Sequence, residues 1–153
     1  MFWQPLNWLG IDAVYTRSYA EYVDNPEGPF VENALEEAAQ FGVAASRDNW
    51  DVSLRVRYLG AYPLLADNSE RAEPLTTVNL RGARHWDVLT VYAEFLNLLD
   101  TDSKEIVYFY PAYVPGLDAQ GTASEDVDCS VTNCRLSRST EPRALRVGVS
   151  YKF

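Results

Sequence analysis

Histidine and cysteine are scarce in this sequence, and basic residues are outnumbered by acidic ones. The chain has one histidine, two cysteines and 13 basic residues against 22 acidic ones, and its formal net charge is -9. A lone histidine, His85, leaves little from which to build the four-ligand sites that zinc prefers. The basic residues are scattered along the chain, which argues against a surface for binding nucleic-acid phosphates. We therefore expect no nucleic-acid partner, no metal and no cofactor.

Long apolar runs are also missing. No segment approaches the roughly 18 consecutive apolar residues that a membrane-spanning helix needs, so a helical membrane protein is excluded. Spanning β-strands escape this test, because every second residue of such a strand can be polar. The first residues, MFWQPLNW, show no basic segment followed by an apolar one, so no secretory signal peptide is visible.

Catalytic patterns are absent as well. The sequence has no glycine-rich phosphate loop and no nucleophile with a base at a recognisable spacing. We expect no enzymatic activity and no catalytic residues.

What the sequence does contain is alternation of apolar and polar residues. The clearest case is WDVSLRVRYLG, residues 50–60, and the last eight residues, RVGVSYKF, repeat the pattern. The apolar sets of these two segments are Trp50, Val52, Leu54, Val56 and Tyr58, and Leu145, Val147, Val149, Tyr151 and Phe153. A period of two predicts strands whose two faces meet different surroundings. Such a strand lies either half-buried in a soluble sheet or with lipid against its apolar side.

Four further segments, residues 9–19, 38–46, 77–86 and 87–100, are also predicted to be strands. The total is about six antiparallel, up-and-down strands in an all-β fold. The joins near residues 47–49 and 85–87 are short, whereas those around residues 25 and 68 and from 101 to 142 are long. We expect residues 101–142 to be irregular. Short joins on one rim and long loops on the other are typical of outer-membrane β-barrels.

One segment, VENALEEAAQ at residues 31–40, does not alternate. Its helix-forming residues favour a short helix in the loop before Ala39. The alternative is a strand that begins near Ala34, with Glu36 and Glu37 above the level of the lipid.

The two cysteines, Cys129 and Cys134, lie close together in the polar segment CSVTNC. A local disulfide in an oxidising compartment is the preferred interpretation. A pair of free thiols is the alternative, and a zinc site is a weaker one.

Three segments together resemble the carboxy-terminal end of the β-barrel of TonB-dependent outer-membrane receptors. They are WDVSLRVRYLGAYPLLADNSER, VNLRGARHWDVLTVYAEFLNLLD and EPRALRVGVSYKF, and the resemblance covers about Trp8 to Phe153. In that family an NL(F/L)D element closes the penultimate strand and a Pro-Arg pair opens the last one. The matching residues here are Asn97, Leu98, Leu99 and Asp100, and Pro142 and Arg143. The ending with Val149, Tyr151 and Phe153 is similar to the signal that the barrel-assembly machinery reads.

This resemblance implies that residues 1–153 form the C-terminal segment of a transmembrane β-barrel, with the plug domain and earlier strands absent. A complete receptor takes up a scarce solute, such as an iron-siderophore complex, cobalamin or an oligosaccharide, across the outer membrane of a Gram-negative bacterium. The implied partners are outer-membrane lipid, the barrel-assembly machinery, a small-molecule ligand and, through the missing plug, the TonB complex. The chain alone is expected to be an inactive fragment.

The aromatic segment YFYPAY is typical of one subgroup of the family in this position. Its members Tyr108, Phe109, Tyr110 and Tyr113 either stack on a ligand or belong to the aromatic girdle at the membrane surface, and we favour the girdle.

Two other functions remain open at this point. One is a soluble all-β ligand-binding module, similar to carbohydrate-binding modules. The other is a structural outer-membrane protein that assembles from several short chains, about four of which would approach the strand number of the family.

Overall fold

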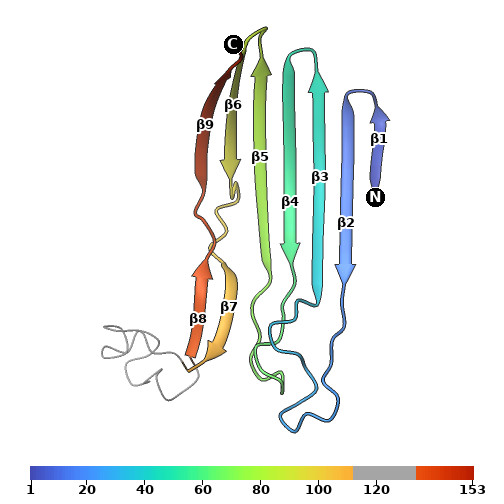
Figure 1. Cartoon of the computed structure of the whole chain (residues 1–153), viewed down its shortest axis with the longest axis vertical. Coiled ribbons are helices and arrows are strands. Elements are labelled where there is room, and N and C mark those ends of the chain that lie inside the picture. The colour runs from blue at the N-terminus through green and yellow to red at the C-terminus, as the bar shows by residue number, and fades with distance from the viewer. Residues whose placement is uncertain (112–133) are drawn as a thin grey trace, which may run out of the picture.

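Nine β-strands and no helix are found in the part of the chain that the structure, a computed structural model, describes, residues 1–111 and 134–153 (Figure 1). The strands are β1 (Phe2–Leu6), β2 (Leu9–Arg17), β3 (Glu37–Arg47), β4 (Trp50–Leu59), β5 (Leu75–His85), β6 (Leu89–Leu96), β7 (Lys104–Tyr110), β8 (Cys134–Ser139) and β9 (Ala144–Tyr151). The all-β, antiparallel, up-and-down fold expected from the sequence is confirmed.

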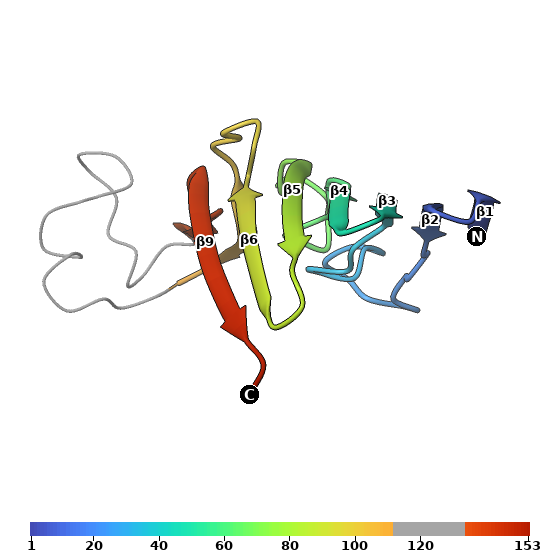
Figure 2. The same ribbon diagram turned by 90° about the horizontal axis from the view of Figure 1, so that it is seen from above.

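Seven strands form one open sheet in the order β1-β2-β3-β4-β5-β6-β9. Every neighbouring pair is antiparallel. Figure 2, seen from above, shows these strands side by side in a single row. The sheet is not closed, because β1 and β9 lie at its two edges. The remaining two strands, β7 and β8, pair with each other beyond the ends of β6 and β9 (Figure 1).

The connections differ between the two ends of the sheet. Turns of two or three residues join β1 to β2, β3 to β4 and β5 to β6, and all three lie at the end where the chain terminates (Figure 1). Asp48 is the first of the two residues in the β3–β4 turn, and its φ is 53°. Aspartate and asparagine adopt this left-handed conformation more readily than most residues. The long β2–β3 and β4–β5 connections lie at the opposite end. The predicted asymmetry of the loops is present, and we name the two ends the short-turn rim and the long-loop end.

The pairing register separates the side chains into two continuous faces. Val52 on β4 pairs with Ala45 on β3 and with Gly82 on β5, so these three share one face. The same face continues through Ala93 on β6 to Val147 on β9. We name it the apolar face. The opposite side, which carries Asp51, Arg55 and Arg57 of β4 and Arg81 of β5, is the polar face.

Two expectations about secondary structure were wrong. Residues 37–40 belong to β3 rather than to a helix, because Ala38, Ala39 and Gln40 are paired in register between β2 and β4. The alternative of a strand is nearer to the structure, although the strand begins at Glu37 and not near Ala34. Sheet pairing on both sides thus overrides the helix propensity of this segment. The stretch 101–142 is also not irregular throughout, since β7 and β8 lie within it.

Buried apolar side chains are concentrated at the long-loop end. Leu64, Ala72 and Val107 are each 2% exposed and contact one another, with Tyr62 and Phe109 packed against them. The β4–β5 loop therefore folds onto the β7–β8 hairpin. The described residues include no helix that is long and apolar enough to cross a membrane.

Candidate functional site

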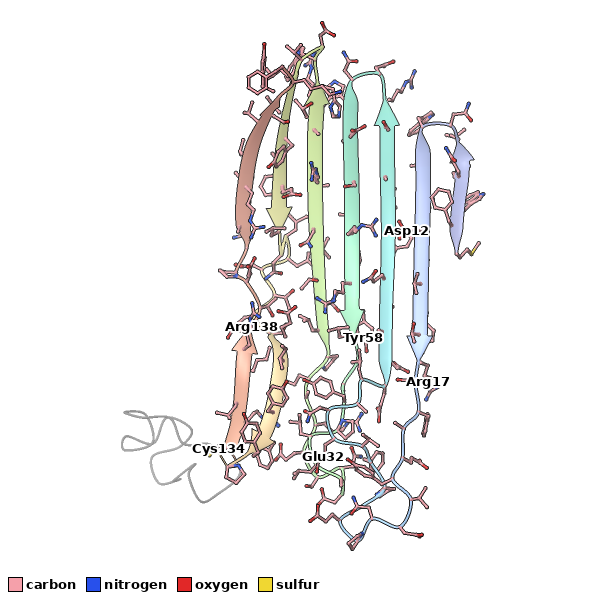
Figure 3. The ribbon with its side chains drawn as sticks, viewed as in Figure 1. Asp12, Arg17, Glu32, Tyr58, Cys134 and Arg138 are labelled. Carbon is pink, nitrogen blue, oxygen red and sulfur yellow. The ribbon has the colours of Figure 1, made fainter. Side chains whose placement is uncertain are left out.

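Ion pairs follow the polar face from strand to strand. Arg55 Nη1 lies 3.3 Å from Asp12 Oδ2, although β3 runs between their strands. Gly42, the residue of β3 between them, makes this contact possible, because a Cβ there would lie 2.4 Å from Asp12 Oδ1. Figure 3 shows Asp12 about midway along β2. The ion pair therefore joins β2 to β4 across β3, above a residue that has no side chain.

A second set of contacts, between neighbouring strands, joins β5, β6 and β9. Arg81 Nη1 lies 3.1 Å from Glu94 Oε1, and the Arg81 guanidinium lies 4.7 Å from the centre of the Tyr92 ring. The Tyr92 ring in turn covers Gly148, its register partner on β9. Aromatic rings over strand glycines are a known device for fixing register. Charge and aromatic stacking thus order the polar face of the last three strands of the sheet.

A hydrogen-bonded chain of four polar residues crosses the polar face near the short-turn rim. Ser46 Oγ donates to Asp51 Oδ1 at 2.6 Å, and His85 Nε2 lies 2.6 Å from Asp51 Oδ2. His85 Nδ1 lies 3.0 Å from Thr90 Oγ1. An open cavity of about 490 Å³ adjoins this group of hydrogen-bonded residues. Its lining includes Asp51, His85, Arg81, Phe2 and Trp8.

The long-loop end is held together by one tyrosine and two arginines. Tyr62 Oη accepts from Val107 N at 3.0 Å and donates to Val107 O at 3.3 Å. Arg71 is 2.5 Å from both Glu36 Oε2 and Asn68 Oδ1, and Arg135 is 2.5 Å from Glu70 Oε2. These contacts fix both long loops to each other and to β8. We call this group the loop platform, and sequence alternation gave no signal for it.

The β4–β5 loop also carries a carboxyl group with a shifted pKa, that of Asp67. The hydroxyl of Ser69 donates to Asp67 Oδ1 at 2.7 Å, and the backbone N–H of Ser69 donates to the same oxygen at 3.0 Å. Both bonds favour the charged form, so they hold the pKa of the exposed Asp67 carboxyl below its usual value.

The structure brings the family-motif residues together. Asn97, 4% exposed, donates from Nδ2 to the carbonyls of Thr101 and Glu141 at 3.1 and 3.0 Å. Asp100 Oδ1 accepts from the backbone N–H of Arg143 at 3.1 Å. The Arg143 guanidinium lies 3.7 Å from Asp100 Oδ2. Asn97, Asp100 and Arg143 therefore join the end of β6 to the start of β9, and we call them the motif clasp.

The other three motif residues make no part of this clasp. Leu98 donates its backbone N–H to Val78 O at 2.7 Å, Leu99 is 63% exposed, and Pro142 is exposed.

The remaining candidate residues are dispersed. Val149 and Tyr151 are exposed on the apolar face near the short-turn rim, and Tyr151 packs edge-to-face on Phe153 with 5.4 Å between ring centres. Tyr108 and Tyr110 form a similar pair on β7, 6.0 Å apart, whereas Phe109 points the other way into the buried cluster. A role as girdle or ligand contact stays a prediction.

Two other candidates, Tyr113 and Cys129, lie outside the described residues. Cys134 opens β8 and is buried, and no described cysteine is free (Figure 3). The Cys129–Cys134 bridge itself stays a prediction. Within residues 1–111 and 134–153, no three histidine, cysteine, aspartate or glutamate side chains are grouped as metal ligands.

Comparison with known proteins places the fold. No family model matches the sequence, and no curated protein matches it. Among solved structures, the copper transporter OprC matches with a TM-score of 0.62 and 12% sequence identity. The match covers 99% of this chain but 23% of that chain, so this chain spans less than a quarter of the transporter's length. At this identity the likeness concerns the fold: the open sheet has the architecture of one segment of that transporter.

Proposed function

We propose that this chain forms part of the wall of an outer-membrane transport barrel, with its apolar face towards lipid and its polar face towards the lumen. The observation that carries the proposal is the exposure of the apolar face. Leu145, Val147 and Val149 are 58%, 65% and 65% exposed. Side chains of these types are usually buried in soluble proteins, and an apolar patch of this extent marks a surface that meets lipid or another protein.

Strand length and loop asymmetry support the same proposal. The six strands β2 to β6 and β9 contain 8 to 11 residues each, close to the roughly 9–11 residues that a tilted spanning strand needs. Short turns at one end and long loops at the other match the two sides of an outer-membrane barrel. A soluble sandwich would cover the apolar face with a second sheet, whereas the seven strands of this sheet form a single row and the apolar residues of β9 are exposed.

We further propose that the transport is TonB-dependent uptake of a scarce solute such as an iron-siderophore complex, cobalamin or an oligosaccharide. This finer assignment is supported by the order of the sequence motifs and by the contacts of the motif clasp. The fold likeness to a copper transporter agrees with a transporter wall. The TonB complex would act through a plug domain, and the barrel-assembly machinery would read Val149, Tyr151 and Phe153.

Cysteine labelling tests which face meets lipid. In a background where Cys129 and Cys134 are replaced by serine, Val147→Cys and Val149→Cys probe the apolar face. Ser53→Cys and Ser150→Cys are the matched probes on the polar face of the same sheet. The full chain is folded in mixed micelles of detergent and phospholipid. Each variant is then treated with a membrane-soluble maleimide and, separately, with a charged one.

We expect Val147→Cys and Val149→Cys to react with the membrane-soluble reagent and to be protected from the charged one. Ser53→Cys and Ser150→Cys should react with the charged reagent. Equal labelling of both faces by the charged reagent would refute the proposed membrane face.

A further inference from the structure

A basic residue, Arg84, lies on the apolar face. Arg84 on β5 pairs in register with Trp50 on β4 and with Val91 on β6, so it belongs to the apolar face and not to the ion pairs of the polar face. It is the second residue from the end of β5, directly below the short-turn rim. Its side chain is exposed. An arginine in this position needs a reason, because a charge on a lipid-facing surface is costly except close to the interface.

The Arg84 guanidinium lies between two indole rings. Its Cζ is 4.8 Å from the centre of the Trp50 ring and 5.0 Å from the centre of the Trp86 ring. Both distances are within the range of cation–π contacts. In the described part of the chain no carboxylate lies within ion-pair distance of Arg84. Among the described residues no ion pair occupies the N–H donors of Arg84, so they remain available to an external anion.

A second arginine lies on the other side of Trp50. Arg47, the last residue of β3, pairs in register with Trp50. Its nearest carboxylate is that of its neighbour Asp48, 3.9 Å away, and the two side chains are 75% and 86% exposed. An ion pair this long and this exposed contributes little. The row Arg47–Trp50–Arg84, with Trp86 beside it, therefore presents two cations at one level of the apolar face, and we call it the arginine row.

No atom covers the apolar face at Gly82, beside the arginine row. Gly82 is two residues from Arg84 along β5 and on the same face, and a Cβ placed there would meet no atom within 4 Å. Its register neighbours are Val52 and Ala93, which are also small. The surface at Gly82, two residues from Arg84, is therefore open to an external apolar group.

We propose that the arginine row binds the phosphate of an anionic phospholipid, with one acyl chain lying over Gly82. This inference rests on the proposed function, since it needs the apolar face to meet lipid. Guanidinium groups bind phosphate through two N–H bonds, and indole rings favour the level of the headgroups. The choice of an anionic lipid follows from the charge of the row, and the choice of a lipid over free phosphate follows from the exposed apolar face beside it, with Val52 46% and Val147 65% exposed.

Tryptophan quenching by brominated lipids tests the site, because Trp50 and Trp86 are part of it. The full chain is folded in mixed micelles that contain either phosphatidylglycerol or phosphatidylcholine, each brominated on the acyl chains. The variants are Arg84→Gln and, as the matched control, Arg81→Gln, which removes one positive charge from the same strand on the opposite face. Trp3 and Trp8 contribute the same background to every sample.

We expect phosphatidylglycerol to quench at lower lipid fractions than phosphatidylcholine, and Arg84→Gln to weaken that preference roughly fivefold, the effect of one basic residue near an anionic surface. Arg81→Gln should keep the preference. Equal quenching by both lipids, or a preference that survives Arg84→Gln, would overturn the lipid site and leave the membrane face intact. Absence of quenching by either lipid would overturn the membrane face itself, and the site with it.

Discussion

Side chains from neighbouring strands lie directly over individual glycines of the sheet. Gly42 lies under the Asp12–Arg55 pair, and Gly148 lies under the Tyr92 ring. A Cβ at either position would come within 2.4 Å of the side chain above it. Gly82 differs, because nothing lies within 4 Å of its Cβ position. Glycines on the polar face therefore lie under long side chains of neighbouring strands, whereas Gly82 on the apolar face is uncovered.

Replacing these glycines by alanine should separate the two roles. Alanine in a strand is more stable than glycine by roughly 0.5–1 kcal/mol, so Gly82→Ala should stabilise the folded chain by about that amount. Gly42→Ala should gain less, because its Cβ displaces the Asp12 carboxylate and breaks an exposed ion pair worth up to about 1 kcal/mol. The measurement is the free energy of unfolding in denaturant, with the chain folded in detergent micelles.

The decisive comparison uses Asp12→Ala as a second background. There the ion pair is already absent, so Gly42→Ala and Gly82→Ala should have the same effect on the free energy of unfolding. A difference between them that persists without Asp12 would mean that the ion pair is not what Gly42 accommodates.

At the scale of the element, the motif clasp explains how the chain leaves the sheet after β6, forms β7 and β8, and returns to the sheet at β9. Asn97 has a φ of 47° and Asp100 a φ of 53°, so the chain bends sharply after β6. Asparagine and aspartate adopt this conformation more readily than most residues. The bend is closed by a hydrogen bond from Asn97 Nδ2 to the carbonyl of Glu141, just before β9. The motif thus keeps the β7–β8 hairpin apart from the sheet while the β6–β9 pairing continues.

Removing the Asn97 side chain should therefore destabilise the chain strongly. Asn97→Ala leaves the backbone N–H of Thr101 and the carbonyls of Thr101 and Glu141 without their partner, and a buried unsatisfied group costs about 1–3 kcal/mol. We expect a loss of at least about 2 kcal/mol in the free energy of unfolding. Leu99→Ala, in the same motif but exposed, is the control and should change it by less than about 0.5 kcal/mol.

A further variant separates the bend from the bonds. Asn97→Gly tolerates the positive φ but lacks the side chain. If it were as stable as the unchanged chain, the backbone conformation rather than the hydrogen bonds would explain the motif.

The elements also show which parts of the fold can be predicted from sequence. β4 and β9 were predicted because strict alternation over eight or more residues is a strong signal. β1 is five residues long and contains Pro5, and β8, CRLSRS, is almost wholly polar, so neither carries that signal. The loop platform depends on contacts between residues far apart in the sequence, such as Arg135 and Glu70, which no local pattern reveals. Arg84 does carry a signal in the sequence, because it interrupts the apolar alternation of β5 two residues before Trp86.

At the scale of the whole molecule, the direction of the edge strands limits how the sheet can be extended. Six successive antiparallel pairings lead from β1 to β9, so these two edge strands run in the same direction. Copies of the chain inserted with one orientation would therefore meet only through parallel edges. Outer-membrane barrels are antiparallel throughout. Assembly from about four identical chains would thus require a rearranged edge strand, which makes that hypothesis the weaker one.

The single-layer sheet also predicts that folding depends on an apolar medium. With the apolar face uncovered, the hydrophobic contribution of residues such as Val147 is realised only when detergent or lipid covers them. We expect far-UV circular dichroism to show β-structure, and tryptophan emission to shift to the blue, in micelles and not in plain buffer.

A matched pair of variants on β9 gives the control. Val147→Arg places a charge on the apolar face and should reduce the folded fraction, at a cost of up to roughly 2–4 kcal/mol near the middle of a bilayer. Ser150→Arg places the same charge on the polar face and should be tolerated. A monomer that folds cooperatively in buffer, or two variants that behave alike, would favour a soluble all-β module instead.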